Sequence, residues 1–352
     1  MSDTIGQSNN RPTRPAWLEV DLGQLAENFR LIRADAPDGL AIGSVVKDAA
    51  YGHGAVEVAR VALGQGAKCL LVSNLDEAAE LRNAGITAPV LLMGERMESE
   101  LPACLELGLT LAIGNAAIAE AASHLASSLG QSLSVHVKID TGMSRYGARW
   151  DASLGLVEKI AALPGLQLEG MFSHFSMSDE LDKSFAREQL ARLRAACAAV
   201  EQAGLAVRCR HLCNSGGFLD LPEAHLDMVR IGLLALGVFP SQVCRRIDGI
   251  EPVGTLKTRL AVVRDIRKGD NVGYGLSYQS PGARRLGVLP LGYGDGYPRV
   301  RNEGHVLVHG KRAPIIGANA MDSTMVDVTD IPEAAAWDEV VLMGRQGDCK
   351  IT

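Results

Sequence analysis

The feature that most constrains the fold is an alternation of short apolar runs with longer helical patterns over the first two thirds of the chain. Eight runs have the length and the branched side chains of buried strands, and helix-like segments separate them. The predicted strands are residues 40–47, 69–73, 89–93, 110–113, 134–139, 166–172, 207–212 and 228–231. Eight such units favour a parallel (β/α)8 barrel, with an open doubly wound sheet as the structural alternative.

The pattern changes after residue 239, where helical periodicity ends and strand-like runs dominate. The strands predicted there are residues 253–263, 286–291, 305–309, 312–316, 325–328 and 339–343. Gly310 and Lys311 lie between two of these runs and are typical of a hairpin turn. We therefore expect a disordered tail (1–15), a barrel (16–244) and a C-terminal all-β domain (245–352).

Composition excludes several classes of function. The 352-residue chain has a net charge of −6 and no basic block, which argues against a nucleic acid or an anionic membrane surface as partner. No apolar run approaches the length of a membrane span, and the polar start lacks the apolar core of a signal peptide. Seven irregularly spaced cysteines suggest reduced thiols and a cytoplasmic protein. Cys209, His211 and Cys213 suggest a metal site, but no second cluster joins them, so no metal is expected.

Polar side chains follow several of the predicted strands at the point where each strand ends. They are Lys47, Lys138 with Asp140, His174, Asn214 with Ser215, and Arg230. Barrel enzymes place their chemistry at the carboxyl ends of the strands, so these side chains are expected to converge. Burial would lower the pKa of Lys47, and a neutral amine can hold an aldehyde covalently. The alternative is a lysine that caps its strand in solvent.

Glycines near the end of the predicted barrel suggest a phosphate site. Ser215 is followed by two glycines, and Gly232 follows the last strand; such turns let backbone N–H groups approach an anion. Two ordinary strand-to-helix turns are the alternative. Arg230 lies in an apolar stretch and needs an acceptor, for which a structural salt bridge would suffice. Arg230 could instead face the pyridine nitrogen of a bound cofactor. Arginine keeps its proton, so the pyridine ring would stay neutral and would be a weaker electron sink. A weak sink favours simple proton exchange over transamination or decarboxylation.

Three further residues have both a functional and an ordinary interpretation. His174 could stack on a flat cofactor or could be a satisfied core histidine. Arg145 shares a turn with Lys138, and it is a candidate fork for a carboxylate or a ring hydroxyl, or else a surface arginine. Tyr274 is flanked by glycines in the β domain. A neighbouring cation could lower its pKa from about 10 and make it a base.

Several motifs resemble those of one known family. Val46-Lys47 followed by Ala50-Tyr51-Gly52-His53-Gly54 is similar to the lysine motif that binds pyridoxal phosphate in alanine racemases. That family is fold-type III, a (β/α)8 barrel followed by a β domain. The resemblance runs from about Trp17 to the last residues and is specific at residues 46–54, 138–147, 172–175, 211–216, 228–232, 274–275, 290–297 and 321–322.

The resemblance implies roles for individual residues. Lys47 would hold pyridoxal phosphate and act as one base, and Tyr274 of the partner subunit would be the base on the opposite face, so the site would need a homodimer. Arg145 and Met321 would contact the substrate. Lys138, often carbamylated in the family, would orient the arginine, and Asp322 would support the site. The remaining cofactor contacts would be Tyr51, Ser215, Gly232 and Leu233 to the phosphate, and Arg230 to the pyridine nitrogen with His174 beside it.

The chain also departs from the family pattern. Leu236 stands where a tyrosine is usual, Ala318 where an arginine is usual, and Ala320 where a serine or cysteine is common. Family members generally continue beyond the position of Thr352 with a tyrosine that helps bind phosphate and gates the substrate. We therefore expect this segment to be missing, through natural or accidental truncation, with consequences for cofactor affinity and substrate selectivity.

The function that the resemblance implies is a two-base racemase for L- and D-alanine that supplies D-alanine for peptidoglycan. Tyr274 would serve the L-enantiomer and Lys47 the D-enantiomer. The alternatives are a racemase of serine or of a broader amino-acid range, a non-catalytic barrel that binds pyridoxal phosphate, and a fold-type III decarboxylase. The β domain with Tyr274 favours an enzyme over the binding protein, and the combined motifs disfavour the decarboxylase.

Overall fold

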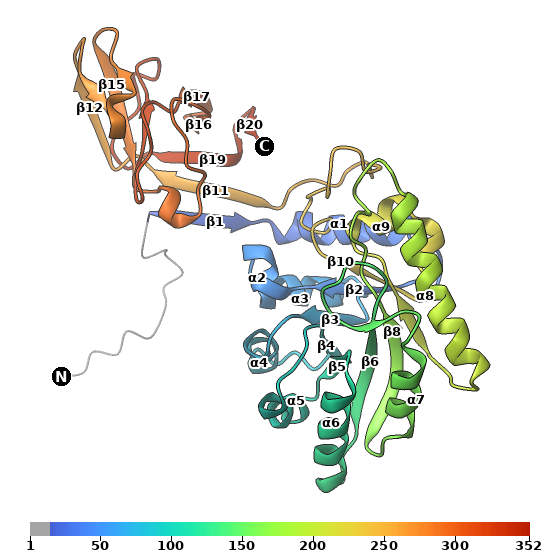
Figure 1. Ribbon diagram of the computed structural model, residues 1–352. Coiled ribbons are helices and arrows are strands. Elements are labelled where there is room, and N and C mark those ends of the chain that lie inside the picture. Colours follow the sequence, from blue (N-terminus) through green and yellow to red (C-terminus); the bar gives the residue numbers. More distant parts are fainter. Residues whose placement is uncertain (1–14) are drawn as a thin grey trace, which may run out of the picture. The chain divides into compact units, whose positions relative to one another are not determined.

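The computed structural model describes residues 15–352, which form two compact units (Figure 1). One unit is Leu22–Val253, and the other joins the described residues up to Asp21 with Gly254–Thr352. This division differs from the expected one at both ends of the barrel. Strand β1 (Ala16–Val20) belongs to the second unit because it pairs antiparallel with β11 (Gly254–Arg259), a partner that local sequence does not reveal. The expected disordered tail, except for Pro15, lies outside the described residues.

The first unit is a closed barrel of eight parallel strands, as predicted. Each strand pairs with the next, and the last pairs with the first, so the open doubly wound alternative is wrong. A further short strand, β7 (Ala148–Arg149), pairs in parallel with the last two residues of the barrel strand that ends at Asp140. The eight strands are β2 (Ala41–Val45), β3 (Cys69–Val72), β4 (Val90–Leu92), β5 (Thr110–Ile113), β6 (Leu133–Asp140), β8 (Leu166–Phe172), β9 (Cys209–His211) and β10 (Met228–Ile231).

Helices cover the outside of the barrel (Figure 1). Asn74 and Asn115 begin two of them, because each side-chain oxygen accepts the backbone N–H three residues later at 2.9 Å. The strands are closely packed around Gly43, where an added Cβ would lie 2.6 Å from Leu71 Cδ1. The helices are α1 (Leu22–Asp35), α2 (Lys47–Gly52), α3 (Ala55–Gly64), α4 (Leu75–Asn83), α5 (Leu101–Glu106), α6 (Ala116–Ser128), α7 (Leu154–Ala162), α8 (Ser184–Gln202) and α9 (Ser215–Asp220).

The second unit is a β structure, as predicted, with a core of buried Val, Leu and Ile side chains. Its main sheet has the order β1-β11-β19-β16-β17, with β20 on β19, and a three-stranded sheet has the order β12-β15-β18. A two-stranded ribbon joins β13 (Asn271–Val272) to β14 (Tyr278–Gln279). The remaining strands are β12 (Val262–Ile266), β15 (Arg284–Leu289), β16 (His305–Val308), β17 (Lys311–Pro314), β18 (Thr324–Asp327), β19 (Glu339–Gln346) and β20 (Cys349–Ile351).

Two details of this unit differ from the sequence prediction. The run 253–263 forms two strands, because the chain passes at Leu260 from the main sheet to the three-stranded sheet. The hairpin between β16 and β17 turns at His309 and Gly310, whose φ values are 51° and 72°, whereas Lys311 already pairs with Val308. Two successive positive φ values match the type I′ turn that fits strand twist.

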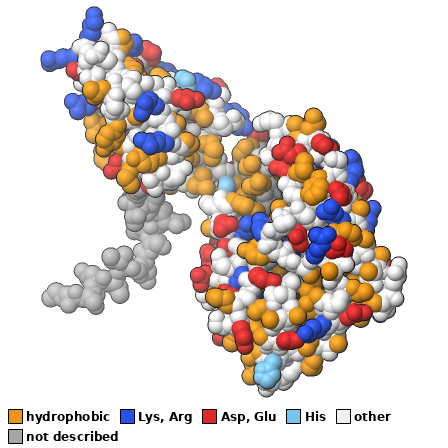
Figure 2. Space-filling view, viewed as in Figure 1, with side chains coloured by type: hydrophobic (Ala, Val, Ile, Leu, Met, Phe, Trp, Pro, Cys, Tyr) orange, Lys and Arg blue, Asp and Glu red, His pale blue; other side chains and the backbone are white. Residues whose placement is uncertain are grey.

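The surface agrees with the charge pattern of the sequence. On the face of the barrel unit seen in Figure 2, acidic and basic side chains are interspersed rather than gathered by sign. Among residues 15–352, no helix combines the length and apolar character needed to cross a membrane.

Candidate active site

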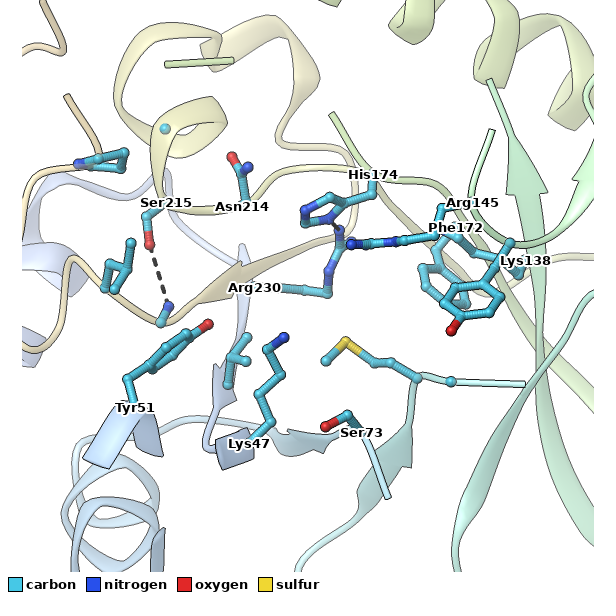
Figure 3. Close-up of a pocket in the computed structure, with 18 of the residues that line it drawn as sticks. Lys47, Tyr51, Ser73, Lys138, Arg145, Phe172, His174, Asn214, Ser215 and Arg230 are labelled. Atoms are coloured by element: carbon cyan, nitrogen blue, oxygen red, sulfur yellow. Dashed lines mark hydrogen bonds between the residues drawn. The ribbon is translucent and has the colours of Figure 1, made fainter. Parts of the chain in front are cut away.

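A cavity of about 520 Å³ opens at the carboxyl ends of the barrel strands (Figure 3). It is lined by the site residues that the sequence predicted within the barrel unit, except Asp140, whose Oδ1 accepts the backbone N–H groups of Gly142 and Ser144 instead. The lining residues include Lys47, Tyr51, Lys138, Arg145, His174, Ser215, Arg230, Gly232 and Leu233. The other predicted residues, Tyr274, Met321 and Asp322, are exposed on the β unit.

Lys47 is held at the start of a left-handed turn. Strand β2 ends at Val45, two residues earlier than the cavity lysine, and Asp48 to Tyr51 then adopt φ of 51–55° and ψ of 39–52°. A left-handed residue with a side chain costs about 1–2 kcal/mol, so this segment needs support from its surroundings. Ala50 N–H donates to Val46 O at 2.9 Å and closes the turn. Lys47 and Tyr51 thereby point into the same cavity (Figure 3).

The environment of Lys47 differs in one respect from the prediction. We expected a buried amine, yet the Lys47 side chain is 35% exposed, and its Nζ lies 3.7 Å from Asp48 Oδ2. The lysine nevertheless lines the cavity rather than capping its strand in bulk solvent.

Arg230 is almost fully buried and has no carboxylate partner among the ion pairs of residues 15–352. Its guanidinium donates to His211 Nδ1 and His174 Nδ1, each at 2.9 Å, and to the carbonyl oxygens of Ser173 and Leu212 at 3.0 Å. The alternative of a structural salt bridge is therefore wrong. Burial lowers the pKa of Arg230 to about 10, which still leaves it protonated at neutral pH. It is a fixed cation surrounded by neutral acceptors.

Arg230 also fixes the protons of the histidines around it. Because a guanidinium only donates, both Nδ1 atoms must accept, which places the ring protons of His174 and His211 on Nε2. Burial and, to a smaller extent, the positive charge of Arg230 hold the pKa of both histidines well below the ordinary value, so both rings are neutral. His211 Nε2 lies 2.8 Å from His136 Nδ1 and donates to it. Burial lowers the pKa of His136 to about 4, which keeps the chain of rings neutral.

Lys138 is buried beside Arg230 and Arg145. Burial, strengthened by these two positive charges, holds the pKa of Lys138 well below its ordinary value. Its Nζ lies 4.5 Å from the centre of the Phe172 ring. Arg145 itself is exposed at the cavity mouth.

The predicted phosphate site is a set of hydrogen-bond donors gathered at one end of the cavity. Ser215 Oγ accepts the backbone N–H groups of Gly232 and Leu234, each at 3.3 Å, and Figure 3 draws one of these bonds. A Cβ on Gly232 would lie 2.7 Å from Tyr51 Oη, so only glycine lets the phenol approach this backbone. Burial raises the pKa of Tyr51, which keeps the phenol protonated as a donor. The hydroxyls of Tyr51 and Ser215 and the backbone at Gly232 thus lie together at the cavity, and this set of polar groups fits an anion such as phosphate.

Two residues near the cavity, His211 and Gln189, were not predicted from the sequence to support it. His211 was singled out only as a metal candidate with Cys209 and Cys213, but it binds Arg230, and Cys213 Sγ contacts Ala224 O at 3.1 Å. Within residues 15–352, no group of three or more His, Cys, Asp or Glu is arranged to hold a metal ion. The buried Gln189 side chain links Ser176, Thr141 and His174 O, an arrangement visible only in three dimensions.

Comparison with known proteins identifies the family. The model of the alanine racemase N-terminal domain matches residues 20–240, and that of the alanine racemase C-terminal domain matches residues 253–352. The chain belongs to the alanine racemase family. An alanine racemase of Desulfovibrio desulfuricans is 42% identical over 332 residues, which cover 94% of this chain and 90% of that protein.

Solved structures agree with this assignment to the alanine racemase family. An alanine racemase of Clostridium difficile has a TM-score of 0.91 at 31% identity, covering 97% of this chain and 89% of that one. A histidine racemase of Leuconostoc mesenteroides has a TM-score of 0.89 at 28% identity, covering 98% and 92%. The resemblance seen in the motifs, the barrel with its β region, and the class of amino-acid isomerase are thus confirmed.

Proposed function

We propose that the chain is a pyridoxal-phosphate-dependent racemase that interconverts L- and D-alanine, with Lys47 and Tyr274 of the partner subunit as its two bases. One observation carries the proposal: a single cavity joins a lysine amine, an anion cradle and a buried guanidinium that is bonded only to neutral acceptors, in a member of the alanine racemase family. These groups match the aldehyde, the phosphate and the ring nitrogen of pyridoxal phosphate.

The cofactor, when bound, supplies an electron sink for negative charge at the substrate Cα. Lys47 Nζ would anchor it and move a proton on one face of Cα. Tyr51, Ser215 and the backbone N–H groups of Gly232 and Leu233 would bind the phosphate. Arg230 would donate a hydrogen bond to the ring nitrogen and keep its own proton, so the sink stays weak and transamination is disfavoured.

His174, hydrogen-bonded to Arg230, would pack beside the cofactor ring. Arg145 would bind the substrate carboxylate through paired N–H donors. A neutral buried amine can add carbon dioxide, so we propose that Lys138 is carbamylated, which would supply the missing negative charge between Arg145 and Arg230. The low pKa of the Lys138 amine supports this modification.

The β unit supports the proposed homodimer. Tyr274, Leu276 and Met321 are 72%, 68% and 63% exposed, so these three large side chains are available to a partner. Tyr274 lies between Gly273 and Gly275, both at positive φ, in a short 3-10 turn. We propose that this face, with Asp322 beside Met321, meets the cavity of a second copy. A role in supplying D-alanine for peptidoglycan in the cytoplasm is part of the same proposal.

The substrate range is the alternative within this proposal. Leu236 and Ala318, which depart from the family pattern, are both buried, and a related structure is a histidine racemase. Racemisation assays with a panel of amino acids would distinguish an alanine racemase from a racemase of serine or of a broader amino-acid range.

The deciding experiment follows L-alanine and D-alanine separately by NMR in heavy water with the protein and pyridoxal phosphate. We expect deuterium at Cα together with inversion from either enantiomer. Tyr274→Phe should abolish inversion while the cofactor stays bound, because only one face of Cα then has a base. Unchanged racemisation by Tyr274→Phe would refute the two-base assignment. A bound cofactor with no exchange from any amino acid would favour a non-catalytic binding protein.

A further inference from the structure

A buried carboxylate lies behind the lysine turn and outside the cavity. Glu77, in the first turn of α4, is 9% exposed. Its Oε1 accepts the backbone N–H of Asp48 at 2.9 Å and the side-chain amide of Asn74 at 3.0 Å. Its Oε2 accepts the backbone N–H of Ser73 at 2.8 Å. Both oxygens of one carboxylate are therefore taken up by N–H groups of two different loops.

The contact with Asp48 lies at the point where the chain changes its handedness. Val46 has φ −118° and ψ 13°, and Asp48 begins the run of positive φ. The peptide bond from Lys47 to Asp48 lies at this point. Its N–H, on Asp48, donates to Glu77 Oε1 rather than to a carbonyl oxygen of the turn. A charged acceptor on this N–H is a strong hydrogen bond, and it fixes the plane of the peptide that carries Lys47.

The other carboxylate oxygen of Glu77, Oε2, ties the peptide of Lys47 to the end of the neighbouring strand β3. Ser73 follows β3 and lines the cavity, and its carbonyl oxygen accepts Arg96 Nη2 at 3.1 Å. Val46 N–H also donates to Leu71 O at 3.0 Å, so the β2 and β3 ends are bound together up to the turn. Beyond that point, Glu77 is the side chain that bridges Asp48 and Ser73.

We propose that Glu77 is a positioning residue for Lys47: its carboxylate holds the left-handed turn in the form that points Lys47 and Tyr51 into the cavity. This inference rests on the proposed role of Lys47 as the residue that binds the cofactor aldehyde. It predicts that the reactivity of Lys47 depends on a carboxylate that touches neither cofactor nor substrate.

The test compares Glu77→Gln with Asn115→Ala. Gln keeps the shape but replaces one acceptor oxygen by an amide NH2, which cannot accept the backbone N–H of Asp48 or of Ser73 and finds the Ser73 hydroxyl, 3.2–3.3 Å from the two oxygens, as an acceptor. Asn115→Ala removes the equivalent cap of α6 and is far from the lysine turn in the chain, so it controls for loss of a helix cap. Both variants are measured by thermal unfolding and by amide hydrogen exchange of a peptide spanning residues 46–54. Lys47 is then labelled with pyridoxal phosphate, reduced with borohydride and located by peptide mapping.

We expect Glu77→Gln to lower the rate of Lys47 labelling about 10- to 100-fold and to raise exchange in residues 46–54. Asn115→Ala should change neither, at a similar melting temperature. Glu77→Asp keeps the carboxylate on a shorter side chain and should restore Lys47 labelling in part. It also provides the test if Glu77→Gln does not fold. If Lys47 is labelled at the same rate in the wild type, Glu77→Gln and Glu77→Asp, this inference is overturned and the proposed function stands. Failure of the wild type to be labelled at Lys47 would overturn the proposed function on which it rests.

Discussion

Gly232→Ala tests whether the anion cradle depends on the close approach of Tyr51. The three atoms nearest to an added Cβ all belong to Tyr51: Oη at 2.7 Å, Cε2 at 3.0 Å and Cζ at 3.1 Å. The Tyr51 backbone is constrained by the left-handed turn, so the ring cannot withdraw without cost. Overpacking of this kind costs about 1–3 kcal/mol.

That cost has two measurable consequences. For a unit the size of this barrel it corresponds to a fall in melting temperature of about 2–12 °C. If the displaced phenol no longer donates to the phosphate, affinity for pyridoxal phosphate falls about 10- to 100-fold. Thermal unfolding of the cofactor-free protein and a fluorescence titration with pyridoxal phosphate measure the two effects separately.

A double-mutant cycle and a matched control sharpen the test. With Tyr51→Ala in place, the added methyl meets an empty space, so Gly232→Ala should then cost less than about 0.5 kcal/mol. Gly155→Ala, in α7, meets nothing within 4 Å, and replacing a helical glycine should be neutral or stabilising by about 0.5–1 kcal/mol. An equal cost of Gly232→Ala with and without Tyr51 would refute the steric reasoning.

Two further predictions concern pH. Because the folded pKa of His136, about 4, lies below the unfolded value near 6.5, its contribution to stability is complete above pH 6.5 and is lost as pH falls towards 4. His136→Asn should remove up to about 3 kcal/mol of that dependence, seen as a flatter plot of unfolding free energy against pH; an unchanged plot would contradict the shift. The folded pKa of Lys138 is also lowered, so holding its amine neutral costs stability at every pH below the unfolded value. In buffer free of carbon dioxide, where the amine is unmodified, Lys138→Met should therefore melt higher than the wild type at pH 7. Added bicarbonate should stabilise only the wild type, and a bicarbonate effect in both proteins would argue against carbamylation.

The sequence by itself determined the architecture, because the relevant signals are local. Apolar runs of strand length alternate with helical segments eight times, and that repeat favours a parallel barrel, whose closure the strand pairing then established. The carboxyl ends of parallel strands meet at one edge, so Lys47, Ser215 and Arg230 could be assigned to one site from their positions alone. The motifs added the family, which the comparisons bear out.

Only the tertiary structure decided which groups support that site. The place of β1 in the β unit depends on hydrogen bonds to β11, which lies more than two hundred residues later in the chain. The same holds for the contacts of Arg230 with His211 and of Glu77 with Asp48: each joins elements that are neighbours only after the barrel closes. The left-handed turn is disfavoured by local preference at all four of its residues, so no local rule predicts it. It exists because the surrounding barrel supplies the hydrogen bonds that offset its cost.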